Sequence, residues 1–212
     1  MQPGRFRSEA RNFAGRLTSL LNRTVCNGPS IGTFTQRGHD YAIVGFGVSD
    51  RDPTAQLIPI DKCTGCQLHM HMFFQLERDK ERDFLMVTSS SLGLCLDDAG
   101  ERVLFHADYE RNKDVYAEAH LQVWASSDDW TELLESRPEQ HELSRLHLPA
   151  GGRRYRTSVE DIVEFIVNER LATPKDDWQT VVDESRREFE DRQLRAAVRR
   201  HPDTAREVLE GL

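Results

Sequence analysis

The stretch Gln67–Glu77, QLHMHMFFQLE, decides the fold class of this chain. Apolar side chains recur at every second position, and a β-strand places alternate side chains on opposite faces of its sheet. The alternation predicts a strand with one buried face, as in an antiparallel sheet that is covered on one side only. The expected buried face holds Leu68, Met70, Met72, Phe74 and Leu76, and the other face holds Gln67, His69, His71, Phe73, Gln75 and Glu77.

Similar strand patterns flank this stretch. The expected strands are Tyr41–Ser49, Gln56–Ile60, Phe84–Ser89, Leu92–Leu96, Arg102–Glu110 and Ala119–Ala125. Their connections are short and no strand–helix–strand alternation is present, which favours a curved antiparallel meander of six or seven strands over a doubly wound sheet. Besides Leu68, Met70, Met72 and Phe74, the apolar face of this sheet is expected to bury Phe105, Leu121 and Val123.

Helical patterns lie at both ends of the chain. Residues 6–23 carry apolar side chains at helical spacing, and Ser158 is followed by two acids, as at the capped start of a helix. Further helices are expected at residues 128–136, 176–200 and 204–209. The fold class predicted is α+β, with an α+β domain at 1–172 and a C-terminal helical appendage at 173–212.

Charge and composition bound the function. The 212 residues carry a net charge of −8, which argues against general affinity for nucleic acid. Residues 1–40 nevertheless carry +4, which indicates either a local basic surface or a solvated helix face. Since no apolar run approaches the roughly 20 residues of a membrane span and no secretory signal pattern is present, we expect no membrane contact and a cytoplasmic location.

The sharpest short motif is Cys63-Thr-Gly-Cys66-Gln-Leu-His69-Met-His71. Two thiols and two imidazoles are ligands that zinc accepts, and histidines two apart in a strand point the same way. All four lie within nine residues, however, which is tighter than the usual zinc spacing, and His69 and His71 also fit an ordinary polar strand face. We predict no metal and no cofactor, with structural zinc at Cys63, Cys66, His69 and His71 as the alternative.

Acids and histidines gather on two expected strands. Asp108 and Glu110 share a face of one strand with His106, and His120 lies on the polar face of the next. If these strands pair, a carboxylate approaches His120, an arrangement that suits general acid–base chemistry. The alternative is a solvated outer face with cross-strand ion pairs.

The segment 146–158, LHLPAGGRRYRTS, adds His147 and an arginine cluster. Arginine forks recognise phosphate and carboxylate well, and a helix N-terminus favours anions. Anion binding is therefore predicted for Arg111, Arg153, Arg154 and Arg156. The alternative is that these arginines pair with the chain's abundant acids.

The segments DYERNKDVYAEAHLQVW (108–124) and LHLPAGGRRYRTSVEDIVEFIV (146–167) resemble a family of uncharacterised bacterial proteins. That family has the loose form R-x-D-Y, then A-H-L-Q-V, then L-H-[IL]-P-x-G-G-x-R-[FY]-R before an acidic helix. A strand with D-Y followed by a strand with a histidine is also similar to small toxin-like domains of toxin–antitoxin systems. This chain departs from the family's arginine at His106, and it has HLQV where those toxins show a second histidine.

Two functions of different classes follow. The first is a nucleic-acid-directed effector of toxin–antitoxin or defence type, a metal-independent ribonuclease with RNA as its partner. Its catalytic residues would be His120, His147, Asp108 and Glu110. The second is a non-enzymatic protein–protein interaction module with an acidic surface. An active centre requires Asp108 or Glu110, His120, and at least one of His147, Arg153, Arg154 and Arg156 to converge on one substrate.

Overall fold

The computed structural model describes residues 3–36, 38–79, 84–125, 127–129, 143–150 and 156–211. Most of the helix expected at 128–136 lies outside these residues, as do Arg153 and Arg154.

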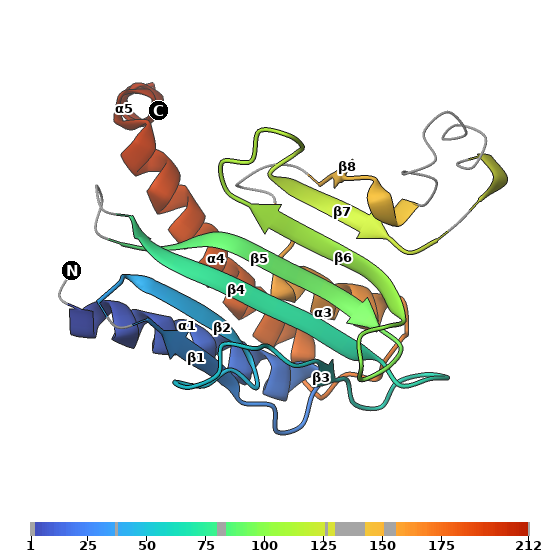
Figure 1. Ribbon diagram of the computed structural model, residues 1–212. Helices are drawn as coiled ribbons and strands as arrows, with labels where there is room; N and C mark the ends of the chain where they lie inside the picture. Colours follow the sequence, from blue (N-terminus) through green and yellow to red (C-terminus); the bar gives the residue numbers. More distant parts are fainter. Residues whose placement is uncertain are drawn as a thin grey trace.

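The chain folds into one antiparallel sheet with helices before and after it, which confirms the predicted α+β class (Figure 1). Among the described residues the sheet has eight strands in the order β1-β2-β4-β5-β6-β7-β8, with β3 paired to β4. The strands are β1 (Ile31–Thr35), β2 (Tyr41–Phe46), β3 (Ile58–Pro59), β4 (His69–Asp79), β5 (Phe84–Cys95), β6 (Val103–Glu110), β7 (Ala119–Val123) and β8 (Leu148–Pro149).

Three strands differ from expectation. The break expected between the strands Phe84–Ser89 and Leu92–Leu96 was wrong, because β5 runs through both and pairs with β4 on one side and β6 on the other. A register irregularity between Gln75 and Leu76 lets the long hairpin continue. β1 and β8 were not expected as strands, and β8 is only two residues long.

The helices are α1 (Pro3–Thr24), α3 (Val159–Asn168), α4 (Trp178–Arg200) and α5 (Pro202–Glu210), with a short 3-10 turn at Leu143–Arg145. α1, α3 and α4 lie behind the sheet in Figure 1, on the face to which the apolar side chains of β4 point. None of the described helices combines the length and the apolar character needed to cross a bilayer.

The two faces of the sheet follow the alternation of β4. Met70 and Met72 are fully buried against the helices, and Leu68 and Phe74 are buried beside them, as predicted. Phe105 is half-buried against the same core, and Leu121 and Val123 are also only half-buried. Among the described strands, only the two-residue β8 lies between their strand, β7, and the edge of the sheet, so less of the described part of the chain covers it.

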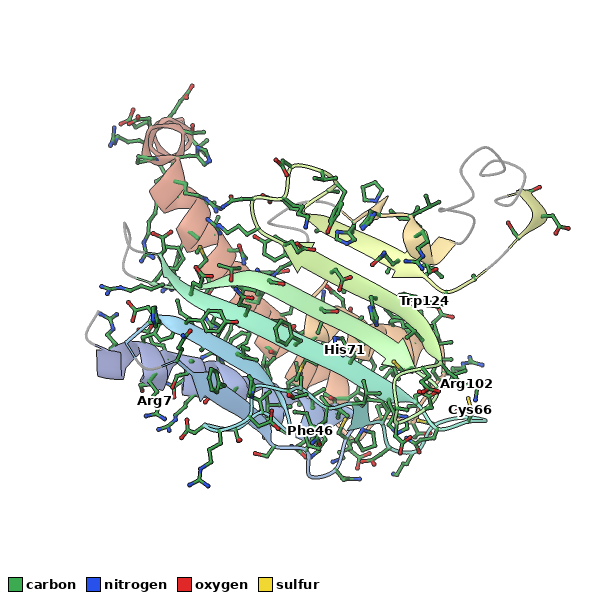
Figure 2. The ribbon with its side chains drawn as sticks, viewed as in Figure 1. Arg7, Phe46, Cys66, His71, Arg102 and Trp124 are labelled. Atoms are coloured by element: carbon green, nitrogen blue, oxygen red, sulfur yellow. The ribbon has the colours of Figure 1, made fainter. Side chains whose placement is uncertain are left out.

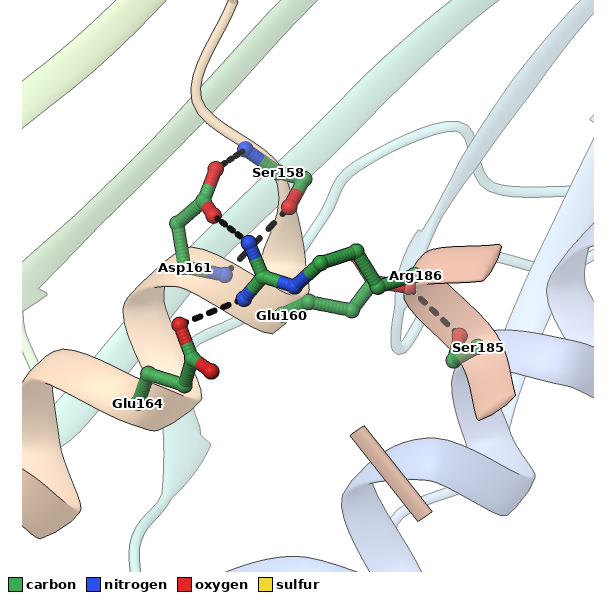
Figure 3. A network of polar contacts seen from close by, with 6 residues as sticks. All are labelled: Ser158, Glu160, Asp161, Glu164, Ser185 and Arg186. Atoms are coloured by element: carbon green, nitrogen blue, oxygen red, sulfur yellow. Dashed lines mark hydrogen bonds and ion pairs between the residues drawn. The ribbon is translucent and has the colours of Figure 1, made fainter. Parts of the chain in front are cut away.

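The start of α3 is fixed by a reciprocal cap. Ser158 is the N-cap, as predicted: its hydroxyl accepts from the backbone N–H of Asp161, and its own N–H donates to the Asp161 carboxylate. Arg186 of α4 then donates to Asp161 at 2.8 Å and to Glu164 (Figure 3). This network holds α4 against α3, and Val181 and Val182 of α4 belong to the common core. The domain boundary at residue 173 stays a prediction.

Candidate acid–base site

The pairing of β6 with β7 builds the site. Asp108 of β6 lies directly opposite His120 of β7, and Ser91 of β5 lies opposite Asp108 on the other side. Directly paired residues point to the same face of a sheet. This row therefore projects from the face that the helices leave uncovered, where Figure 2 shows His71.

His120 is held in a defined orientation. Its side chain is only 2% exposed, and its Nδ1 lies 3.0 Å from the carbonyl oxygen of Ala117. A carbonyl oxygen can only accept a hydrogen bond, so Nδ1 carries the proton. Nε2, the nitrogen left for proton transfer, lies 4.0 Å from a carboxylate oxygen of Asp108.

The second carboxylate oxygen of Asp108, Oδ1, is in an unusual environment. Oδ1 is buried and accepts no hydrogen bond from the described residues. Buried carboxylate oxygens without a donor are rare in folded proteins because desolvation is then uncompensated. A hydroxyl group or a water molecule would supply the missing donor.

His147 reaches the same place from a distant part of the chain. β8, which begins at Leu148, pairs with β7 so that Pro149 lies opposite His120. The ring of His147 meets the ring of His120 edge-on, with centroids 4.7 Å apart, and stacks on Tyr116 with centroids 3.8 Å apart. Burial and the neighbouring His120 lower the pKa of His147 below its ordinary value, while Asp108 and Glu110 oppose the shift.

Glu110 is tied to these rings through Tyr116. The Tyr116 hydroxyl donates to one Glu110 oxygen at 2.8 Å, and Lys113 donates to the other at 2.7 Å. The hydrogen bond from Lys113 is the main cause that holds the pKa of Glu110 below its usual range, so this carboxyl is ionised at neutral pH. Tyr116 also contacts His120, with ring centroids 4.7 Å apart.

The four residues predicted as catalytic, Asp108, Glu110, His120 and His147, thus lie in one cluster. Tyr116 and Lys113 complete it, and sequence reasoning missed both. They come from the turn between β6 and β7, where the only signal was their place between two strands that were already candidates. His147 satisfies the requirement that a further group converge on His120.

Arg156 and Arg111 do not join this cluster. The Arg156 guanidinium lies 5.1 Å from the centre of the Tyr109 ring, and Tyr109 is the neighbour of Asp108 in β6, so it points to the helix-covered face. Arg111 lines the same cavity as Tyr109 and Arg156. Arg156 is therefore not the group that converges on His120, because one step along a strand reverses the face, and anion binding by Arg111 and Arg156 stays a prediction. Arg153 and Arg154 lie outside the described residues.

The alternative zinc site is not assembled. Within the described ranges no three His, Cys, Asp or Glu side chains are grouped so as to hold a metal. The Cys63 thiol donates to the carbonyl of Ile60, Cys66 is exposed, and the ring of His71 stacks on His106 instead. The motif is a turn followed by a strand, so its spacing did not bring the four side chains together.

The uncovered face carries a second row beside the first. His71 of β4 and His106 of β6 stack with ring centroids 5.3 Å apart across Gly93 of β5, and Trp124 packs on His106. Burial is the main cause that lowers the pKa of both histidines. This pair borders the acid–base cluster, since His106 and Asp108 are two residues apart on one face.

Comparison with known proteins supplies no template for this arrangement. No family model, curated protein or solved structure matches the chain. The resemblance to uncharacterised bacterial proteins and to toxin-like domains stays a prediction.

Proposed function

We propose that this protein is a metal-independent ribonuclease of toxin or defence type, with its active centre at Asp108, Glu110, His120 and His147. One observation carries the proposal: two histidine rings in contact, 4.7 Å apart, with a carboxylate 4.0 Å from the nitrogen of one of them. A pair of acid–base groups is the minimum that cleavage of RNA requires, because RNA contains its own nucleophile in the 2′-hydroxyl.

The reaction divides between the two histidines. His147, whose lowered pKa favours the neutral ring and which is less buried than His120, takes the proton from the 2′-hydroxyl. The 2′-oxygen forms a bond to phosphorus as the bond from phosphorus to the 5′-oxygen breaks. In its imidazolium form, which carries a proton on Nε2 as well as on Nδ1, His120 donates the Nε2 proton to that leaving oxygen, which gives a 2′,3′-cyclic phosphate and a free 5′-hydroxyl.

The remaining groups orient and balance charge. The carbonyl of Ala117 fixes the His120 ring, and Asp108 faces the nitrogen that transfers the proton. Glu110 and Tyr116 hold the stack on which His147 rests. Lys113 is a cation of this cluster: its ammonium group donates to Glu110 and has further N–H groups to offer a phosphate, since the net charge of −8 otherwise repels RNA.

The test compares a single-stranded RNA with DNA of the same sequence, with and without a chelator. We expect cleavage of RNA alone, unaffected by the chelator, with cyclic phosphate ends. His120→Ala and His147→Ala should each lower the rate at least about a hundredfold, the usual contribution of a positioned acid or base. His39→Ala, which removes an exposed histidine far from the cluster in sequence, is the matched control and should keep the parent rate.

Expression in bacteria gives an independent test of the proposed function. Growth arrest by the parent and its relief by His120→Ala support the proposal. Equal cleavage of DNA, dependence on a metal ion, or full toxicity of the alanine variant would contradict it.

The second candidate is the interaction module, and one observation favours it. Apolar side chains are exposed along the end of α4 and on α5, among them Leu194 at 64% and Leu209 at 71%. Exposed apolar groups that cluster on one region mark protein contacts. An inert parent in both assays above would leave this as the better explanation.

A further inference from the structure

A basic cavity lies on the opposite side of the sheet from the acid–base cluster. It occupies about 440 Å³ between α1, the C-terminal half of α4, and the ends of β4, β5 and β6. Small-molecule sites commonly measure about 300–1,000 Å³. The cavity is therefore of a size for a small ligand rather than for a folded partner.

The lining of the cavity is positively charged, whereas the chain as a whole is negatively charged. Seven arginines line it, Glu9 is the only acid among the described lining residues, and the chain as a whole carries −8. The arginines come from four separate parts of the chain: Arg16, Arg111, Arg156, and Arg192, Arg195, Arg199 and Arg200 of α4. Because 192, 195 and 199 are three, four and seven apart, the helix itself presents them on one face.

Several of these cations have no acid to balance them. Arg111, Arg156, Arg195 and Arg199 form no ion pair with the described residues, and Glu9 pairs with Arg5. Burial lowers the pKa of Arg156 and of Arg16, and nearby Arg111 and Arg192 respectively lower them further. Like charges gathered in this way destabilise a fold unless a counter-charge is bound.

The floor of the cavity is apolar and aromatic. Phe13 of α1 and Phe189 of α4 line it with Leu76, Leu85 and Val87 of the sheet. The Arg156 guanidinium lies between two rings, 5.1 Å from the centre of Tyr109 and 5.6 Å from the centre of Phe189. Such a floor accepts a flat or apolar body, while the arginines accept several anionic oxygens.

We propose that this cavity binds a nucleotide, with its phosphates on the arginines of α4 and its base over the phenylalanine floor. A phosphate chain offers several oxygens to several guanidinium forks, which a single carboxylate does not. The base of the nucleotide is the planar group that packs on the phenylalanine floor. The site is distinct from the proposed active centre and does not depend on it.

The experiment measures affinity by calorimetry for three probes: a nucleoside triphosphate, inorganic pyrophosphate and the unphosphorylated nucleoside. We expect the triphosphate to bind most tightly, pyrophosphate at least about tenfold more weakly, and the nucleoside not measurably. The double variant Arg195→Gln, Arg199→Gln should weaken triphosphate binding at least about tenfold. Both side chains are exposed, so the core stays intact.

Arg187→Gln is the matched control, because it removes an exposed arginine from the same helix but outside the cavity. It should bind the triphosphate as the parent does. Loss of binding equal to that of the double variant would reduce the effect to overall charge and overturn the site. Equal affinity for pyrophosphate and triphosphate would overturn the assignment of a nucleotide, and absence of triphosphate binding at millimolar concentration would overturn the proposal entirely.

Discussion

Gly93 is the residue that allows two histidines from separate strands to meet. It lies between His71 and His106 in the sheet, and a Cβ at this position would stand 2.3 Å from the carbonyl oxygen of Phe105 and 2.6 Å from the His106 ring. The first of these atoms belongs to the backbone of β6 and cannot move without disturbing the ladder. Only glycine fits between the two strands.

We therefore expect Gly93→Ala to destabilise the protein by more than about 2 kcal/mol, through strain in the β5–β6 ladder. Chemical denaturation measures the change. Gly15→Ala is the control, because nothing lies within 4 Å of a Cβ there and alanine stabilises a helix interior by about 0.5–1 kcal/mol. A loss of stability in the control, or none in Gly93→Ala, would speak against this account.

At the scale of residues, the sequence predicts neighbours across adjacent strands and fails for more distant ones. Asp108 and His120 could be placed together because both lie on polar faces of consecutive strands. Arg156 could not be placed, since it follows a connection whose path no periodicity describes. It lies instead over Tyr109, on the other face from the adjacent Asp108.

Among the elements, hydrophobic periodicity predicts the long strands. It misses segments that are held as strands only by their pairing with adjacent strands. β4 has eleven residues and alternates between half-buried and buried side chains from His69 to Leu76, which identifies both the strand and its buried face. Ser90 and Ser91 separate two expected strands in the sequence prediction, yet β4 and β6 hold them in the middle of β5 by ladders on both sides. β3 and β8 have two residues each, too few for any period.

The histidine pair that joins β4 and β6 makes stability depend on pH. Burial holds the pKa values of His71 and His106 below the ordinary value of about 6.5, with Asp108 opposing the shift. Below about pH 6.5 the unfolded chain therefore binds more protons than the folded protein, and stability falls as pH falls. It is fully retained above that value.

Between pH 7.5 and 5.5 we expect the free energy of unfolding to drop by roughly 1 kcal/mol or more. The double variant His71→Gln, His106→Gln should show a shallower fall, measured by urea denaturation across that range. His39→Gln with His201→Gln removes two exposed histidines and should leave the slope unchanged. The idea fails if the two double variants have the same slope.

At the scale of the whole molecule, the sheet separates two kinds of chemistry. The acid–base cluster lies on its uncovered face, and the arginine cavity lies between the sheet and the helices. Residues that share no partners affect function independently. Composition gives the place of neither site. For the cavity in particular, the net charge of −8 hides its basic lining.

We expect the two sites to be separable by mutation. His147→Ala should leave the affinity for nucleoside triphosphate within about twofold of the parent, and the double variant Arg195→Gln, Arg199→Gln should leave the rate of RNA cleavage within about twofold. When all three changes are combined, the change in binding free energy for the triphosphate and the change in activation free energy for cleavage should each equal the sum of the separate changes within about 0.5 kcal/mol. A larger interaction would mean that the sheet couples the two faces.

Because β8 is short, the segment that places His147 against His120 is weakly attached to the sheet. Of the residues that the structure describes after β7, only Leu148 and Pro149 pair with it, and proline has no N–H to give to a ladder. The backbone N–H of Ala150 donates one further hydrogen bond to the carbonyl of Ala119, and the Gln122 side chain donates to the carbonyl of Ser144 in the preceding 3-10 turn. So thin an attachment opens far more often than the molecule unfolds, and the amide of Ala150 should exchange with solvent faster than those of β6. His147 can thus move away from His120 while the sheet stays whole, and under the proposed function this opening would admit an RNA strand.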